Sequence, residues 1–156
     1  MNTEQSNNMK RKVLVVDDNA SFRELLTDLL EMIGYDVWTA KDGLAGLDTL
    51  HHGPFDLILT DYRMPGMSGL EMAAFIRRSD TVTPIVLITG DTCALDPEMV
   101  ARAGITRVLP KPVQIDEFLK ICSVESKETK GNGTSTTRQK ETSQMSRAMS
   151  KPIALG

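Results

Sequence analysis

Side chains that can do phosphoryl chemistry stand at the ends of four short apolar runs in this sequence. They are Asp17, Asp18, Asp61, Thr89 and Lys111. Three carboxylates brought together repel one another unless a cation lies among them or their pKa values rise. Carboxylate oxygens with room for water suit Mg²⁺. A lysine and a hydroxyl beside them can hold the oxygens of a phosphoryl group, which an Asp carboxylate can accept as a nucleophile.

These groups can act together only if the fold gathers them at one place. The apolar runs are short and bounded by turn signals, as buried strands are, at 13–16, 37–40, 55–61, 84–90 and 106–109. Helical patterns separate or follow them at 22–33, 42–53, 68–78, 97–103 and 114–124. This alternation predicts an α/β fold, a doubly wound five-stranded parallel sheet with right-handed crossovers and helices on both faces. All carboxyl ends of such strands lie at one edge, where open α/β sheets bind ligands.

The helix boundaries and inward faces can also be predicted. Ser21 and Glu24 form a possible capping box for the first helix, and Asp96 is the expected N-cap of the fourth, before Pro97. The positions expected to face inward are Phe22, Leu25, Leu26, Leu29, Leu30, Ile33, Leu44, Leu47, Leu50, Leu70, Ala73, Ala74, either Ile76 or Arg77, Ile115, Phe118, Leu119 and Cys122. Taken alone, Asp61 could instead simply cap the turn that follows it.

Composition limits the class of protein. The 156 residues are 40% hydrophobic and 25% charged, as in an ordinary globular protein, and the net charge of −3 gives no reason to expect binding to nucleic acid. No apolar run approaches a membrane span, and the polar start lacks a secretory signal, so a cytoplasmic location is expected. Residues 1–10 are interpreted as a disordered leader, and 125–156 as a flexible, polar, mildly basic tail.

One protein family has motifs that contain all of these strand-end residues in the same order along the chain. Asp17-Asp18, Asp61 to Gly66 (DYRMPG), Thr89-Gly90 and Lys111-Pro112 resemble the motifs of the receiver domain of bacterial two-component response regulators, over about residues 11–124. The resemblance implies a flavodoxin-like sheet of strand order 2-1-3-4-5. It implies that Asp61 is the phosphoacceptor, with a histidine kinase or histidine phosphotransferase as the donor. The strand-end groups are then explained together, which the turn-capping interpretation of Asp61 does not achieve.

The same resemblance assigns a role to each site residue. Asp18 and Asp61 would ligate Mg²⁺ directly together with the backbone carbonyl of Arg63, and Asp17 would act mostly through water. Lys111 would hold the phosphoryl oxygens, and Thr89 would turn to donate a hydrogen bond to them. The Lys111–Pro112 peptide would be cis. The signal would leave through the surface formed by the fourth helix, the fifth strand and the last helix.

Two features depart from the family pattern. Val108 stands three residues before Lys111, where receivers usually carry Tyr or Phe. Because an aliphatic side chain cannot make the ring movement of that aromatic residue, we expect the output to use backbone shifts after Thr89 or another surface. Arg63 and Asp91 each lie two residues beyond a site residue, at positions that in the family flank the opening through which hydrolytic water enters. An ion pair between them would slow hydrolysis of a phosphoaspartate. The alternative, two independently solvated side chains, stays open because an exposed ion pair is worth only about 0–1 kcal/mol.

Several functions remain open at this stage. The favoured one is a single-domain response regulator, a signalling module rather than an enzyme, acting on an unidentified downstream protein as a monomer or phosphorylation-dependent dimer. Alternatives are a phosphorelay intermediate, a receiver fragment of a hybrid histidine kinase, or a pseudo-receiver that is not phosphorylated. An Asp-nucleophile phosphatase is disfavoured because it needs a second Asp where Arg63 stands.

Overall fold

The structure is a computed structural model that describes residues 9–128. The predicted leader, apart from Met9 and Lys10, and the predicted tail beyond Glu128 lie outside the described residues. Among the helices that are described, none has both the length and the apolar character that crossing a membrane requires.

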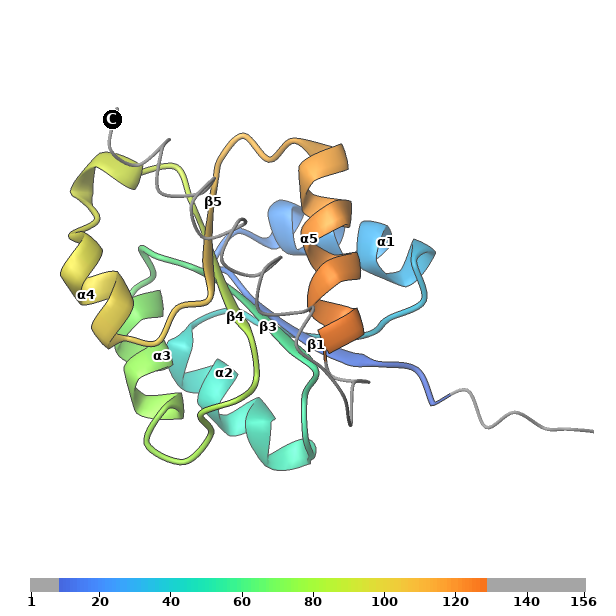
Figure 1. The fold of residues 1–156 in the computed structure, drawn as a ribbon, viewed down its shortest axis with the longest axis horizontal. Coiled ribbons are helices and arrows are strands. Elements are labelled where there is room, and N and C mark those ends of the chain that lie inside the picture. Colours follow the sequence, from blue (N-terminus) through green and yellow to red (C-terminus); the bar gives the residue numbers. More distant parts are fainter. Residues whose placement is uncertain (1–8, 129–156) are drawn as a thin grey trace, which may run out of the picture.

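Five parallel strands form one sheet in the order β2-β1-β3-β4-β5, which confirms the predicted topology (Figure 1). The strands are β1 (Lys12–Val16), β2 (Asp36–Ala40), β3 (Leu57–Asp61), β4 (Ile85–Thr89) and β5 (Arg107–Pro110). The helices are α1 (Ala20–Met32), α2 (Gly43–Thr49), α3 (Gly69–Ile76), α4 (Pro97–Arg102) and α5 (Ile115–Glu128), with short 3-10 turns at Leu50–His52 and Thr92–Ala94.

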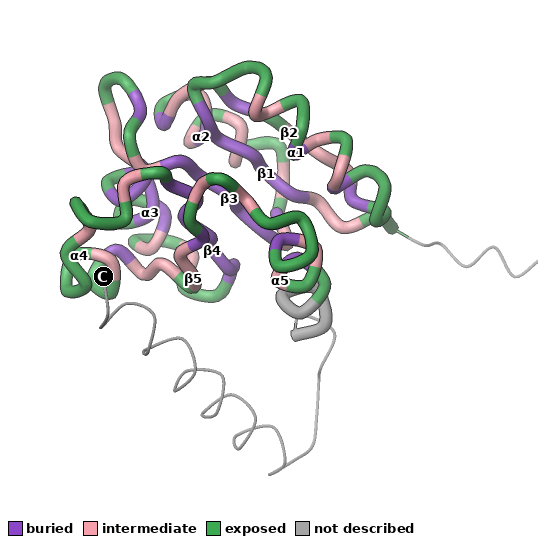
Figure 2. Tube along the Cα trace, turned by 90° about the horizontal axis from the view of Figure 1, so that it is seen from above, coloured by how far each residue is buried: buried purple, intermediate pink, exposed green. Residues whose placement is uncertain are grey.

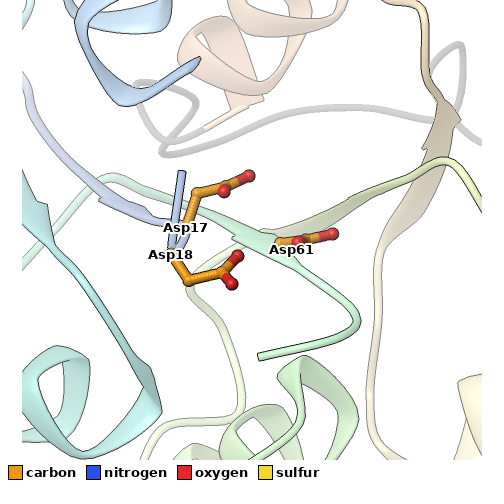
Figure 3. A group of neighbouring side chains, drawn as sticks. All are labelled: Asp17, Asp18 and Asp61. Carbon is orange, nitrogen blue, oxygen red and sulfur yellow. The ribbon is translucent and has the colours of Figure 1, made fainter. Parts of the chain in front are cut away.

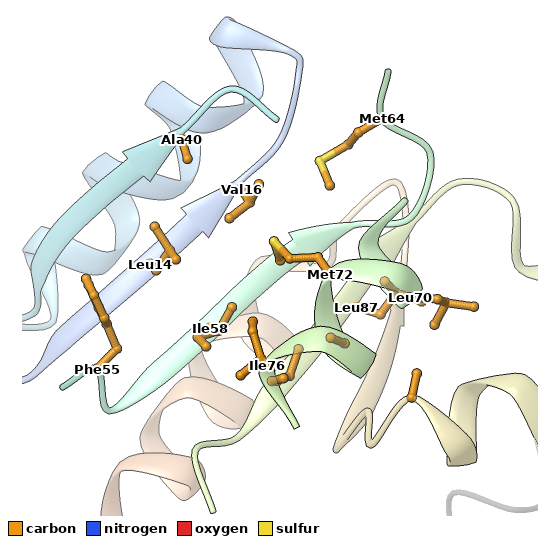
Figure 4. Packing of buried hydrophobic residues seen from close by; sticks show 13 residues of the cluster. Leu14, Val16, Ala40, Phe55, Ile58, Met64, Leu70, Met72, Ile76 and Leu87 are labelled. Atoms are coloured by element: carbon orange, nitrogen blue, oxygen red, sulfur yellow. The ribbon is translucent and has the colours of Figure 1, made fainter. Parts of the chain in front are cut away.

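The sheet has a hydrophobic cluster on each face because alternate strand residues point to opposite sides. Every residue of β3 and β4 is buried, as expected for strands covered on both faces (Figure 2). Leu14, Ile58 and Leu87 belong to the cluster that α3 covers (Figure 4). Val15 and Leu59 belong to the opposite cluster, which contains residues of α1 and α5.

Helix α1 begins differently from the prediction. Its N-cap is Asn19, whose Oδ1 accepts a hydrogen bond from the Phe22 amide, so the capping box expected at Ser21 and Glu24 was wrong. The helix starts earlier because Asn19 follows the strand closely and is itself a strong N-cap residue. A complete capping box occurs instead at the start of α3, between Ser68 and Glu71, where it was not predicted. The predicted Asp96 cap and Pro97 start of α4 are confirmed.

Several helix positions predicted to be buried are exposed. They are Leu25, Ile33, Leu44, Ala74 and Ile115. The apolar template covers a wide arc of each helix, whereas the contact with the sheet buries a narrow stripe, which in α1 consists of Leu26 and Leu30. The last helix also runs to Glu128 rather than ending at about 124.

Candidate functional site

The three predicted carboxylates meet at the carboxyl edge of the sheet. One oxygen each of Asp17, Asp18 and Asp61 lies within 4.8 Å of the others (Figure 3). Asp61 is the last residue of β3, and Asp17 directly follows β1, which pairs with β3. Asp17 and Asp61 are buried and Asp18 is exposed, so the cluster opens to solvent on the Asp18 side.

Lys111 joins this cluster from the loop after β5. Its Nζ donates a 3.0 Å hydrogen bond to Asp17 Oδ2 and lies 3.6 Å from Asp61 Oδ1. The lysine amide donates to the carbonyl of Thr89, which fixes this loop against the end of β4. One ammonium therefore faces two of the three carboxylates, and the site keeps an excess of negative charge.

The carboxylate oxygens differ in whether they already accept a hydrogen bond from the protein. Asp17 uses both oxygens, since Oδ1 accepts from the Asn19 amide and Oδ2 from Lys111. Asp61 Oδ1 accepts from the Tyr62 amide at 2.8 Å. Within the described part of the chain, Asp61 Oδ2 receives no hydrogen bond. The oxygens open to a new ligand are therefore those of Asp18 and Oδ2 of Asp61.

Burial raises the pKa of Asp61 above the ordinary value of 3.8. The negative charges of Asp17 and Asp18 raise the pKa further, while the Lys111 ammonium and the Tyr62 amide lower it. Desolvation is the largest of these effects, and it disfavours the charged carboxylate. A bound cation would relieve this penalty.

Thr89 ends β4 next to the acidic cluster, because Asp61 pairs with Ile88, the preceding residue. The hydroxyl is buried, and its Oγ1 accepts a 3.1 Å hydrogen bond from the Asp91 amide. The Lys111–Pro112 peptide is cis, as predicted. Val108 lies on β5 opposite Leu87 and packs, partly buried, against the cluster that α3 covers.

Of the two arrangements considered for Arg63 and Asp91, the structure has the ion pair. The Arg63 guanidinium lies 2.5 Å from Asp91 Oδ2, with side chains 68% and 40% exposed. The pair links the loop after β3 to the loop after β4 at the surface beside the site. Its effect on hydrolysis stays a prediction, as does the metal-ligand role of the Arg63 carbonyl.

Two site residues were not found from the sequence. The Phe22 ring of α1 lies 4.2 Å, centroid to Nζ, from Lys111. A Cβ added to Gly69 would fall 2.0 Å from the backbone oxygen of Asp61, so only glycine lets α3 begin this close to β3. The only features of the sequence that could have indicated them are an aromatic residue in the first turn of α1 and a glycine at the start of α3. Neither feature by itself predicts a contact with the end of a strand.

Comparison with known proteins identifies the family. The family profile described as "Response regulator receiver domain" matches residues 13–123, which is most of the chain. The chain belongs to the response regulator receiver family. All five predicted strand-end residues lie within the matched segment of this receiver.

The similar proteins include kinases and regulators. The receiver is 42% identical over 111 residues to the sensor histidine kinase AruS of Pseudomonas aeruginosa, covering 69% of this chain and 11% of that protein. It is 38% identical over 109 residues to a response regulator receiver protein of Anaeromyxobacter sp., covering 70% of this chain and 46% of that protein. The chain therefore spans less than half of the length of either relative.

Solved receiver structures share its fold. The chemotaxis response regulator CheY4 of Vibrio cholerae superimposes with a TM-score of 0.69 at 33% identity, covering 74% of this chain and 98% of that chain. The response regulator TrrA of Thermotoga maritima, solved in complex with Mg²⁺ and BeF, gives a TM-score of 0.69 at 31% identity and covers 74% and 98%.

Proposed function

We propose that this receiver takes a phosphoryl group from a phosphohistidine onto Asp61 in a Mg²⁺-dependent reaction, and that the phosphorylated form signals through protein contacts. The observation that carries the proposal is the meeting of three carboxylates with the Lys111 ammonium at one sheet edge. A cap for the following turn needs one carboxylate. It does not need three, nor the lysine between them.

The residues fit Mg²⁺. Carboxylate oxygens within 4.8 Å of one another can share one small cation, and Mg²⁺ in proteins uses one or two carboxylates and keeps several waters. Asp18 and Asp61 would hold the ion directly, because both oxygens of Asp17 already accept hydrogen bonds. When bound, the ion neutralises charge on the oxygens of the phosphoryl group.

Asp61 acts as the nucleophile through one of its two carboxylate oxygens. A P–O bond forms at Asp61 while the P–N bond to the donor histidine breaks, and the electron pair of that bond stays on the imidazole nitrogen. The donor is left neutral when its ring carries a proton on the other nitrogen. Lys111, already 3.6 Å from Asp61 Oδ1, stabilises the negative oxygens during transfer.

Thr89 connects the phosphoryl group to the surface. Its hydroxyl turns to donate to a phosphoryl oxygen, and the Asp91 amide then loses the acceptor that it has in this structure. The loop containing Thr92–Ala94 and the Arg63–Asp91 pair respond together, because Asp91 belongs to both. Output through this loop suits a receiver that has Val108 in place of an aromatic residue.

The larger setting of this receiver is a further part of the proposal. We favour a cytoplasmic single-domain regulator that is not an enzyme in its own right, acts on a downstream protein and binds no nucleic acid itself. The 42% identity to a segment of a sensor histidine kinase supports the second candidate, a receiver belonging to a hybrid kinase or phosphorelay.

Transfer from phosphohistidine tests the proposal. A histidine phosphotransferase domain is phosphorylated by a histidine kinase and ATP that carries a radiolabelled γ-phosphate, purified, and mixed with the receiver and Mg²⁺. We expect label to move to the wild type and not to the Asp61→Asn variant. If several such donors, together with small phosphodonors, leave the wild type unlabelled, the chain is a pseudo-receiver.

A further inference from the structure

Phe22 of α1 is in contact with the site lysine, although the chemistry of the site gives an aromatic ring no role. Its ring centroid lies 4.2 Å from Lys111 Nζ, well inside the range of a cation–π interaction. The same ammonium donates to Asp17 and approaches Asp61. Lys111 is therefore held between an aromatic face and two carboxylates.

The ring and the lysine are joined by a closed series of contacts. The Phe22 amide donates to Asn19 Oδ1, and the Asn19 amide donates to Asp17 Oδ1. Asp17 Oδ2 accepts from Lys111 Nζ, which in turn lies over the Phe22 ring. The N-cap of α1 thus fixes both the acceptor of the ammonium and the ring on which it rests.

We propose that Phe22 is a positioning residue that holds the Lys111 ammonium at the acidic cluster before any phosphoryl group arrives. This inference rests on the proposed function of the site. A lysine side chain has several freely rotating bonds, and without a contact besides the two carboxylates it can leave them for water. A group already in place stabilises charge in the transition state without reorganising.

The same contact makes a prediction for the metal-binding step. An ammonium held near Asp17 and Asp61 repels an incoming cation, so Phe22 should weaken the binding of Mg²⁺ while it helps phosphoryl transfer. A residue that merely packs α1 onto the sheet would be expected to impair both or neither. Phe22 does pack there, partly buried, so the substitution must keep apolar volume.

The test compares Phe22→Leu, which keeps an apolar side chain, with Phe22→Tyr, which keeps the ring. Each change is made in the wild type and in a Lys111→Met background. Mg²⁺ affinity is measured by calorimetry, and the rate of phosphorylation is measured with phosphoramidate. For Phe22→Leu we expect Mg²⁺ to bind about two- to tenfold more tightly and phosphorylation to slow by a similar factor, the range that a cation–π contact supports. Phe22→Tyr should stay near the wild type.

The Lys111→Met background separates positioning from packing. There, Phe22→Leu should leave Mg²⁺ affinity unchanged, since no ammonium remains to be held. The same effect in both backgrounds, or no effect of Phe22→Leu on Mg²⁺ affinity, would overturn the inference. A wild type that binds Mg²⁺ but takes no phosphoryl group would overturn the proposed function, while the Mg²⁺ comparison would still decide the role of Phe22.

Discussion

Removing the charge of Asp61 should stabilise the metal-free protein. One oxygen each of Asp61, Asp17 and Asp18 lies within 4.8 Å of the others, and at an effective dielectric constant near 20 each repulsion costs about 3.5 kcal/mol. The attraction between Asp61 Oδ1 and Lys111 Nζ, which lie 3.6 Å apart, stabilises the protein by about 4–5 kcal/mol at the same dielectric constant. The balance for Asp61 is a cost of about 2 kcal/mol, because two repulsions exceed one attraction before the burial of the charge is added.

The pH dependence of stability should have the matching sign. The pKa of Asp61 is raised in the folded state, so the folded protein binds a proton at this residue more strongly than the unfolded chain does. Stability attributed to this residue is therefore greatest below the ordinary value of 3.8 and is lost as pH rises through the raised pKa. The Asp61→Asn variant should therefore be more stable than the wild type at pH values above the raised pKa of Asp61. At pH values below 3.8 the two proteins should be equally stable.

Urea unfolding at neutral pH without divalent cations measures this effect. We expect Asp61→Asn to raise the free energy of unfolding by about 2 kcal/mol, which moves the midpoint by about 1 M urea for a domain of this size. Asp28→Asn removes the same charge from an exposed position of α1 and should leave the midpoint nearly unchanged. Saturating Mg²⁺ should reduce the difference in the free energy of unfolding between the two proteins, because the ion stabilises the wild type. An Asp61→Asn variant less stable than the wild type would refute the reasoning.

Three other changes have definite expected outcomes. Arg63→Ala and Asp91→Ala should each shorten the lifetime of the phosphorylated protein by up to about fivefold, the limit for an exposed pair worth at most about 1 kcal/mol, and unchanged lifetimes in both would contradict the shielding role. Gly69→Ala should destabilise the fold by about 1–3 kcal/mol in urea, because its Cβ would overlap the Asp61 carbonyl; an unaltered midpoint would contradict this contact. Mg²⁺ affinity, followed by calorimetry, should fall as pH decreases through the raised pKa of Asp61, since the proton and the cation compete for it; a constant affinity across that window would contradict the pKa shift.

The sheet and its acidic edge could be predicted because strand ends in a parallel sheet are set by topology. Asp17, Asp18 and Asp61 follow short buried runs, and no detail of packing is needed to place them together. The cis peptide before Pro112 was expected only from the resemblance to receiver domains. The Arg63–Asp91 pair was one of two arrangements that their spacing from the strand ends left open.

The helix contacts could not be predicted in the same way. Whether Leu44 or Ile115 is covered depends on how each helix rotates and where it ends on the sheet, which periodicity alone leaves open. The first residue of α1 could not be predicted either, because Asn19 and Ser21 are both acceptable N-cap residues. In the structure, the hydrogen bond from the Asn19 amide to Asp17 Oδ1 favours Asn19 as the cap. The contact of Phe22 with Lys111 follows from that start.

The most direct measurement of the role of Asp61 is the intact mass of the protein after incubation with phosphoramidate, whose P–N bond resembles that of phosphohistidine. Wild type and Asp61→Asn are compared with Mg²⁺ present and with the metal removed by a chelator. We predict that only the wild type with Mg²⁺ gains one phosphoryl group. A gain of equal extent in the Asp61→Asn variant, or in the wild type without metal, would contradict the assignment of Asp61 as the Mg²⁺-dependent phosphoacceptor.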